Sequence, residues 1–479
     1  MENLLIGRVE EVAILEEALA SREAEMVSVI GRRRVGKTYL INTIYKDRID
    51  FEITGLQNAP RSEQLQNFAY QLTRITQSSI PIQTPKNWLE AFTFLIRFLE
   101  DQQKKKQEKL VVFLDELSWM ATHKSGFLRG LSFFWNSWAV KQHIVVVICG
   151  SAASWMIQKV VNHKGGLHNR ITKRIFLAPF TLLETETYLK SKNVFFDRYQ
   201  IIQLYMAMGG IPHYLKEVSG KGSAIQNIER ICFARQGLLQ DEFSRLYPSL
   251  FTDAEKHIAV IRSLATTKQG LTRKRLVEQL PFSEGGTLKK ILEELEQSGF
   301  IASYRPFNKK KKEKLYRLID EYSHFYLTFI EGKEHEGNDI WHHLSQTQAF
   351  TSWSGYAFES LCLKHIPQIK KALSIAGIYS LSSSFYKKGT ATDKGIQIDL
   401  LIDRSDHTIN LLELKFYKEN FTLTKVYAEQ LRTKMSIFRK ATKTTKQLSW
   451  VLLTTFGMEA NQHSLGLIQQ ALTMDDLFN

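Results

Sequence analysis

The stretch that decides the fold of the first part of this chain reads Gly31-Arg32-Arg33-Arg34-Val35-Gly36-Lys37-Thr38. It matches the whole G-x-x-x-x-G-K-[ST] pattern of a phosphate-binding loop. The apolar run 26–30 before it predicts a buried strand, and the residues from Tyr39 onward predict a helix. In this strand–loop–helix context, backbone N–H groups curve around an anion and the helix N-terminus adds its dipole.

The loop predicts a site for ATP and Mg²⁺. Lys37 is expected to reach the β- and γ-phosphates, and the Thr38 hydroxyl is expected to bind Mg²⁺. The residues of the loop that we expect to hold the nucleotide are Gly31, Arg34, Val35, Gly36, Lys37 and Thr38.

Two further apolar runs end in polar residues. The run 110–114 ends in Asp115-Glu116, which predicts carboxylates at the tip of a central parallel strand, the edge where open α/β sheets bind ligands. Asp115 is expected to hold Mg²⁺, directly or through water, and Glu116 to polarise the water that attacks the γ-phosphate. The run 144–149 ends in Gly150-Ser151, so Ser151 either senses the γ-phosphate or only forms a turn.

Two arginines, Arg170 and Arg174, follow this run. Arg170 is our candidate for an arginine finger that acts on its own subunit or on a neighbouring one. The second case would imply a homo-oligomer assembled through this domain. A surface salt bridge is the alternative.

The composition bounds the class of protein. The chain has 479 residues, which predicts two or three domains, and its 43% hydrophobic and 24% charged content is typical of a folded protein. Its three cysteines, Cys149, Cys232 and Cys362, are too far apart for a disulfide framework or a zinc motif. With neither a signal peptide nor a run of membrane-spanning length, we expect a cytoplasmic protein without a membrane partner. The net charge of +15 favours a polyanionic partner, DNA first.

The order of these features resembles that of the archaeal-type ATPases, which belong to the STAND class of P-loop NTPases. The matching segments are Ile6-Gly7-Arg8, the phosphate-binding loop, Asp115-Glu116, Cys149-Gly150-Ser151, Asn169-Arg170 and Gly209-Gly210-Ile211-Pro212. In that class the Gly-x-Pro element lies near the adenine, so the resemblance implies that Gly210 and Pro212 contact the nucleotide.

Residues 252–320 predict three short helices followed by a hairpin, an order that resembles a winged helix. A capping box at 252–255 is expected to open the first helix, and Leu271 the second. If the module binds DNA, the third helix (287–295) lies in the major groove and the lysines 309–312 of the wing contact phosphates. The alternative is an internal packing module, and the glutamates beside the lysines of the third helix weaken its role in reading the groove.

The last part of the chain carries a third group of candidate functional residues. The runs 397–402 and 409–415 predict two paired strands on which Asp399, Glu413 and Lys415 share one face. Two carboxylates and a lysine on otherwise apolar strands are costly unless they bind something. Oxygen ligands of this kind suit Mg²⁺ or Mn²⁺.

This set resembles the signature of the PD-(D/E)XK nuclease superfamily, although Gln397-Ile398 stands where that pattern has a proline before Asp399. We expect Asp399 and Glu413 to bind the metal, Glu359 to complete the metal site, and Lys415 to orient or deprotonate the attacking water. The alternative is a nuclease fold kept for DNA binding or packing.

We therefore expect an α/β protein in which a P-loop parallel sheet with a helical continuation (1–250) precedes a winged helix (251–320). A helical connector (321–350) and an α/β/α nuclease-like domain (351–479), ending in a helix through Leu465 and Leu472, complete the chain. The hypothesis is an ATP-regulated, Mg²⁺-dependent DNA endonuclease. The alternatives are a STAND-type ATP switch and a DNA-bound regulator whose nuclease-like domain only binds partners.

Overall fold

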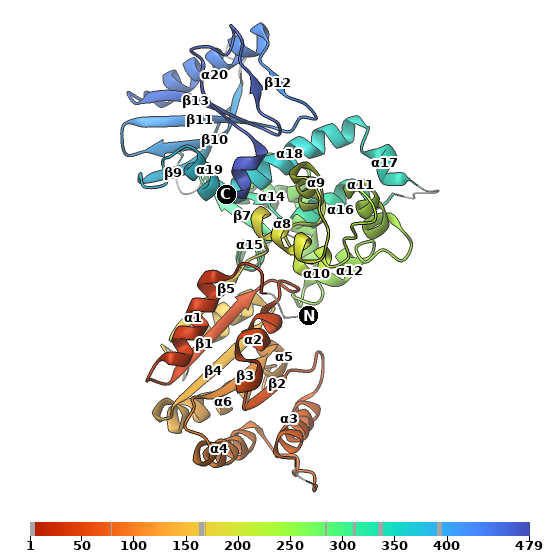
Figure 1. Cartoon of the computed structure of the whole chain (residues 1–479), viewed down its shortest axis with the longest axis vertical. Helices are drawn as coiled ribbons and strands as arrows, with labels where there is room; N and C mark the ends of the chain where they lie inside the picture. The colour runs from red at the N-terminus through yellow and green to blue at the C-terminus, as the bar shows by residue number, and fades with distance from the viewer. Residues whose placement is uncertain are drawn as a thin grey trace. The chain divides into compact units, whose positions relative to one another are not determined.

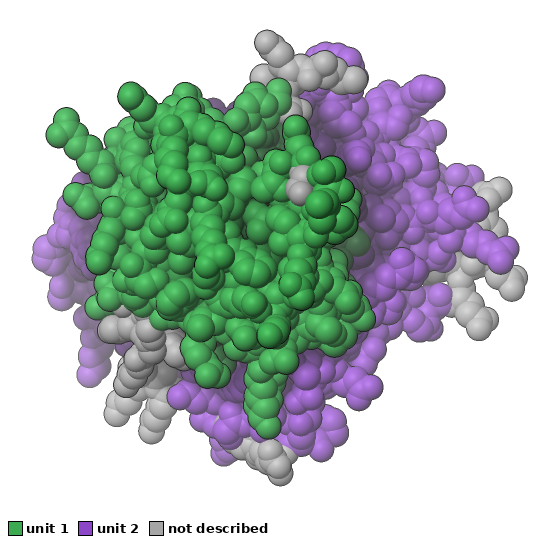
Figure 2. All heavy atoms as spheres, turned by 90° about the horizontal axis from the view of Figure 1, so that it is seen from below, with its two compact units in different colours: residues 1–179 green, residues 180–479 purple. Residues whose placement is uncertain are grey.

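The computed structural model describes residues 5–77, 79–161, 167, 169–282, 285–309, 313–333, 339–389 and 395–479. The chain divides into two compact units, residues 1–179 and residues 180–479 (Figure 2). Of the wing lysines, 310–312 lie outside the described residues. Within the described parts, no helix combines the length and the apolar composition needed to cross a membrane.

The first unit contains a parallel sheet in which the strand that leads into the phosphate-binding loop is enclosed by neighbours. The order is β2-β3-β4-β1-β5. The central strands β1, β3 and β4 are buried almost throughout, because a parallel sheet is covered on both faces, whereas the edge strands β2 and β5 alternate buried and less buried residues. The bounds are β1 Glu25–Gly31, β2 Phe51–Thr54, β3 Leu110–Asp115, β4 Ile144–Gly150 and β5 Lys173–Leu177.

Helices cover this sheet (Figure 1). An aromatic core joins α4 to α6, where the ring centroids of Trp88 and Phe127 lie 4.7 Å apart. The Tyr45 hydroxyl of α2 donates a hydrogen bond to the Leu15 carbonyl of α1 at 2.8 Å. The helices are α1 Val9–Ala20, α2 Lys37–Tyr45, α3 Arg61–Thr76, α4 Trp88–Lys105, α5 Leu117–Met120, α6 Phe127–Ser137 and α7 Ala153–Met156, with shorter turns η1 Lys46–Arg48, η2 Ala139–Lys141 and η3 Ile157–Val161.

The second unit begins with short helices linked by a glycine turn. Gly209 has φ +68°, and the Phe180 N–H donates to the Gly210 carbonyl at 2.7 Å. A Cβ on Gly210 would lie 2.0 Å from the Phe180 carbonyl oxygen, so this close approach requires glycine. The elements are α8 Leu182–Ser191, α9 Arg198–Met208, α10 Pro212–Leu215, α11 Ala224–Ile228, η4 Glu229–Phe233 and α12 Glu242–Leu246.

Three helices and a small sheet follow, in the predicted order. The sheet order is β6-β8-β7, with β8 antiparallel to both neighbours. The elements are α13 Ala254–Ala265, β6 Leu271–Thr272, α14 Arg273–Gln279, α15 Gly285–Gln297, β7 Ile301–Tyr304 and β8 Leu315–Leu318.

Two details of this region differ from the prediction. The capping box at 252–255 does not form: α13 begins at Ala254, so Asp253 rather than Thr252 is its N-cap, and the Asp253 side chain makes no cap hydrogen bond. Leu271 does not open a helix: it pairs with Tyr316 in the sheet, and the Thr272 hydroxyl then caps α14. In both places strand pairing or local backbone geometry overrides the sequence pattern.

The rest of the second unit holds a five-stranded sheet of order β15-β13-β11-β10-β9. Strands β9, β10 and β11 are antiparallel, whereas β13 and β15 run parallel to β11. The strands are β9 Ser380–Lys387, β10 Ile396–Arg404, β11 Thr408–Lys415, β13 Gln447–Thr454 and β15 Ile468–Leu472, with a separate pair β12 Phe421–Thr422 and β14 Met458–Glu459. The helices are α16 Glu321–Phe329, α17 Ile340–Leu344, α18 Gln348–Lys364, α19 Ile366–Ala372, α20 Lys425–Thr442 and the short η6 Met474–Phe478.

The predicted helix through Leu465 and Leu472 is wrong. Residues 468–472 form the edge strand β15, which pairs with β13 from Trp450 to Leu453. As a strand, residues 468–472 pair with the backbone of β13, and a helix at this position could not make these hydrogen bonds. The stabilisation from this pairing outweighs the helix preference that the periodicity indicates.

We predict opposite effects of alanine at two glycines of the second unit. Gly210→Ala forces a Cβ against a backbone oxygen and should lower the free energy of unfolding by about 2 kcal/mol or more. Gly355→Ala lies inside α18 with no atom within 4 Å of the added Cβ, so it should raise the free energy by about 0.5–1 kcal/mol. Urea denaturation of the full-length variants measures both, and a Gly210→Ala variant as stable as the wild type would contradict the packing described.

Candidate functional site

The phosphate-binding loop curves between β1 and α2. Arg34 and Gly36 adopt the left-handed region, with φ of +72° and +94°. Gly36 is the residue that precedes α2, and nothing lies within 4 Å of its would-be Cβ. At the other end of the loop, a Cβ on Gly31 would lie 2.5 Å from the Leu177 carbonyl oxygen of β5. Val35 is buried and anchors the loop between these two glycines.

Lys37 and Thr38 lie where the motif predicts. The Lys37 ammonium donates to the carbonyl oxygens of Gly31 at 2.9 Å and Arg32 at 3.0 Å, so its charge lies within the curve of the loop. The Thr38 hydroxyl donates to Asp115 Oδ2 at 2.7 Å. The sheet order therefore brings both predicted Mg²⁺ ligands together, and a hydroxyl beside a carboxylate is a donor set that fits this ion.

Glu116 and Ser151 form a pair next to these ligands. Ser151 donates to Glu116 Oε2 from its hydroxyl at 2.7 Å and from its backbone N–H at 3.1 Å. Because β4 lies between β3 and β1, the ends of these three strands meet at one edge. Ser151 therefore holds Glu116, the candidate base. The sequence does not predict this contact.

Arg170 lies at the opposite edge of the sheet. It precedes β5, and the Thr172 N–H of the same segment donates to the Met26 carbonyl at the start of β1. From Met26 to Gly31 the strand runs about 16 Å, at roughly 3.3 Å per residue, which is more than an arginine side chain can span. The predicted action of Arg170 within its own subunit is therefore wrong, and its action on a neighbouring subunit remains a prediction.

Pro212 is the first residue of α10 and belongs to the second compact unit. Proline is favoured at this position because the first turn of a helix needs no N–H donor there. The contact of Pro212 with the adenine remains a prediction.

In the second unit, Asp399 and Glu413 lie on neighbouring antiparallel strands. Leu400 of β10 pairs with Leu412 of β11, which places the two carboxylates side by side. The Leu414 N–H donates to Asp399 Oδ2 at 3.2 Å. Glu413 is 2% exposed, so a largely buried sheet holds two adjacent carboxyl groups. The predicted shared face is confirmed.

Three donors hold Glu413. The Lys415 ammonium lies 2.9 Å from its Oε1, the Lys434 ammonium 2.8 Å from its Oε2, and the Tyr427 hydroxyl donates to Oε1 at 2.6 Å. Burial alone would raise the pKa of the Glu413 carboxyl, but the two ammonium groups outweigh it and hold the pKa below its usual range.

Tyr427 and Lys434 were not among the residues predicted for this site. Both come from α20, which packs across the sheet. Their spacing of seven residues puts them on one face of that helix, which is the signal that the sequence offers. Only the packing of α20 on β11 shows that this face meets Glu413.

The negative charge of Asp399 is offset by fewer positive groups than that of Glu413. Burial, followed by the charges of Glu413 and Glu359, raises the pKa of the Asp399 carboxyl to about 7, against an opposing effect of Lys415. The two carboxyl groups of Asp399 and Glu413 offer the oxygen donors that a divalent metal takes, although Lys415 and Lys434 already neutralise Glu413.

Glu359 is held by a different partner. The Arg317 guanidinium of β8 donates to Glu359 Oε1 at 2.6 Å and to the Ser360 hydroxyl at 3.1 Å, and both charged groups are buried. Among the described residues, no three histidine, cysteine, aspartate or glutamate side chains gather in a metal-holding arrangement. The structure brings Asp399, Glu413 and Lys415 together and pairs the predicted third ligand, Glu359, with arginine.

These groups line a cavity of about 730 Å³. Its walls include Glu359, Asp399, Glu413, Lys415 and Lys434. The carboxyl groups and the two lysines beside them therefore lie on the wall of one cavity.

Residues 5–218 match the family model of an ATPase domain predominantly from Archaea. This part of the chain is therefore similar to an archaeal-type ATPase domain, and we refer to it as the ATPase domain. Among curated proteins, the chain is similar to the uncharacterized protein MJECL04 of Methanocaldococcus jannaschii, with 22% identity over 422 residues that cover 86% of this chain and 88% of the relative.

Solved structures resemble the chain in fold. The Walker-type ATPase PABY2304 of Pyrococcus abyssi has a TM-score of 0.50 at 17% identity, and the likeness covers 67% of this chain and 96% of that one. The ORC2 protein of Aeropyrum pernix, in its ADPNP–ADP complexes, has a TM-score of 0.41 at 15% identity and covers 72% and 98%. At such identities the first likeness shows an α/β fold with a P-loop parallel sheet.

Two substitutions should separate nucleotide binding from hydrolysis in the ATPase domain. Lys37→Ala removes the charge within the loop and should weaken binding of a fluorescent ATP analogue by about tenfold or more. Glu116→Gln keeps the side-chain shape but not the base, so it should bind normally and hydrolyse roughly 10²-fold more slowly. Phosphate release at wild-type rate by Glu116→Gln would exclude Glu116 as the base.

The raised pKa of Asp399 predicts a pH-dependent stability. In the unfolded chain this carboxyl has the ordinary aspartate pKa of 3.8, whereas in the folded chain its pKa is about 7, so the folded state loses stability as pH rises between these values. Asp399→Asn should therefore raise the thermal midpoint in EDTA, by a margin that grows up to about pH 7 and then levels off. The control Asp403→Asn, on the same strand, loses an ion pair with Lys446 and should lower the midpoint. A margin that shrinks with rising pH would contradict the assignment.

Proposed function

We propose that this protein is an ATP-regulated, Mg²⁺-dependent DNA endonuclease of the STAND type. The observation that carries the proposal is the juxtaposition of Asp399, Glu413 and Lys415 on adjacent strands at the wall of a cavity. Because apolar strands tolerate such a group only when it serves a purpose, we assign it to catalysis.

At the nuclease-like site, Asp399 and Glu413 would hold Mg²⁺ or Mn²⁺, which supplies charge neutralisation at the scissile phosphate and a more acidic water. Lys415 would orient that water or take its proton. Lys434 and Tyr427 would fix the Glu413 carboxylate, which keeps its rotamer ready for the metal.

At the ATPase site, Thr38 and Asp115 would hold Mg²⁺, which neutralises the β- and γ-phosphates. Glu116 would polarise the attacking water once Ser151 releases it. Hydrolysis of DNA needs no ATP, so the nucleotide would control assembly or domain arrangement. Arg170 would take part by reaching the nucleotide of a neighbouring subunit.

The winged-helix-like module would supply DNA affinity rather than sequence reading. The exposed Lys289 and Lys290 of α15 lie 3.8 Å and 3.7 Å from Glu293 and Glu294, so their charges are partly matched on the helix itself. The net charge of +15 supports a sequence-independent attraction to DNA.

A second candidate is a STAND-type ATP switch or DNA-bound regulator whose last domain only binds partners. The specific observation in its favour is that Glu413 and Glu359 are satisfied by lysine, tyrosine and arginine side chains of the chain itself. Such a site would be structural and would not cut DNA.

Cleavage assays decide between the two candidates. We expect the wild type to cut single-stranded DNA with Mg²⁺ or Mn²⁺, Glu413→Gln to lose at least about 10²-fold of that rate, and Lys37→Ala to lose the response to ATP. The matched control is Glu429→Gln, an exposed position on α20, which should cut at the wild-type rate. If no metal or nucleotide condition supports cleavage by the wild type, the nuclease proposal fails and the binding switch stands.

A further inference from the structure

Two cavities meet at Asp399. One is the cavity of about 730 Å³ beside Glu413, and the other has about 770 Å³ and is bounded by residues of β9. Both are lined by Lys268, Glu359, Gln397 and Asp399. Asp399 therefore lies on the wall of both cavities.

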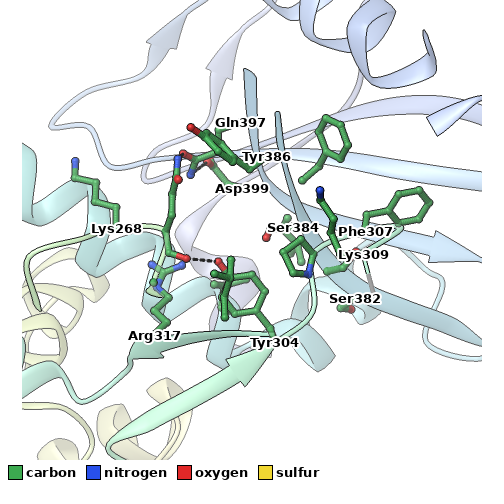
Figure 3. Close-up of a pocket in the computed structure, with 18 of the residues that line it drawn as sticks. Lys268, Tyr304, Phe307, Lys309, Arg317, Ser382, Ser384, Tyr386, Gln397 and Asp399 are labelled. Atoms are coloured by element: carbon green, nitrogen blue, oxygen red, sulfur yellow. Dashed lines mark hydrogen bonds between the residues drawn. The ribbon is translucent and has the colours of Figure 1, made fainter. Parts of the chain in front are cut away.

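The larger cavity lies between two parts of the second unit that are distant in sequence (Figure 3). One wall is the small sheet with the residues that follow β7, and the other is the edge strand β9 with α18 and α19. The Phe307 N–H donates to the Ser384 carbonyl at 2.9 Å, and Gln269 Nε2 donates to Gln397 Oε1 at 3.0 Å. These bonds hold the two walls together.

An exposed aromatic ring stands beside the acidic group in this cavity. Tyr386 of β9 pairs with Gln397 of β10, so it shares the sheet face of Gln397 and of Asp399 two residues further on. Figure 3 shows its ring next to both side chains. Tyr386 is 42% exposed, and the exposed Lys388 follows it on the cavity wall.

The other cavity repeats this arrangement. Tyr417, two residues after Lys415, is 44% exposed although its ring packs against Phe421 at 5.1 Å. The exposed Lys418 follows it, and both residues line the cavity. Asp399 is thus flanked on each side by an exposed tyrosine and a lysine.

We propose that the two cavities form one channel that takes a single strand of DNA across Asp399. Tyrosine rings stack on bases of any sequence, and lysines neutralise the backbone, which is the combination that binds single strands. A turn of duplex DNA, about 34 Å long, occupies on the order of 10⁴ Å³ and does not fit such spaces. The inference rests on the proposed nuclease function and names its substrate as single-stranded or unpaired DNA.

Binding in EDTA tests the channel without cleavage. The full-length chain is titrated into a labelled 20-nucleotide strand and, separately, into the duplex of the same sequence. Tyr386→Ala and Tyr417→Ala should each raise the dissociation constant for the single strand about tenfold and leave that for the duplex unchanged. Tyr386→Phe should retain the wild-type affinity, because the ring is what stacks.

Matched controls define the site. Tyr379→Ala changes a tyrosine that is 74% exposed and lines neither cavity, so it should bind the single strand as the wild type does. Lys388→Gln should lower the slope of log affinity against log salt for the single strand by about 0.7. Equal losses for strand and duplex in Tyr386→Ala, or no loss for either, would overturn the channel.

Cleavage in Mg²⁺ then separates this inference from the function on which it rests. If single-strand binding responds to Tyr386→Ala but no condition supports cleavage, the channel stands and the nuclease proposal fails. If wild type and Tyr386→Ala cut closed duplex at the same rate, the nuclease proposal stands and the channel fails.

Discussion

The Glu413 carboxylate lies buried in the five-stranded sheet, and the hydrogen bonds and ion pairs that hold it there constrain how the second unit packs. A carboxylate without partners in such a place would cost several kcal/mol or would take up a proton. Lys415 supplies a partner from the same strand, whereas Lys434 and Tyr427 reach it from α20. The helix and the sheet are thereby fixed to each other in register as well as by their apolar contacts. Asp399, on the adjacent strand, has fewer partners, and its raised pKa is the consequence.

Arg317 connects the small three-stranded sheet to this region. Its guanidinium comes from β8, and Glu359, Ser360 and the Tyr356 hydroxyl that it contacts all belong to α18. A buried arginine of this kind tolerates little displacement, because moving it leaves a charge without a partner. Any rearrangement of the winged-helix-like module would thus act directly on Glu359, and a second contact through Gln269 and Gln397 ends next to Asp399. These contacts form a physical route by which the small sheet and the acidic site influence each other.

In the ATPase domain, polar side chains at the end of the sheet are also paired with one another, because the strand order brings them together. Parallel strands deliver Gly31, Asp115 and Ser151 to one edge because β4 lies between β3 and β1. The side chains at that edge satisfy one another: Thr38 with Asp115, and Ser151 with Glu116. The same geometry places Arg170 at the edge of the sheet opposite to the phosphate-binding loop.

The sequence by itself determined the phosphate-binding loop, the apolar strands with their terminal carboxylates, and the shared face of Asp399, Glu413 and Lys415. These features depend on local terms, namely a glycine pattern, runs of β-branched residues and the two-residue period of a strand. Only the tertiary structure decided that residues 468–472 extend a sheet, that Leu271 joins β8, that Glu359 meets Arg317, and that Tyr427 and Lys434 hold Glu413. Each of these depends on a partner 14 or more residues away in the chain. The partner of a strand, or of a buried charge, is whichever segment the fold brings close to it. The periodicity of one segment does not indicate which other segment that is.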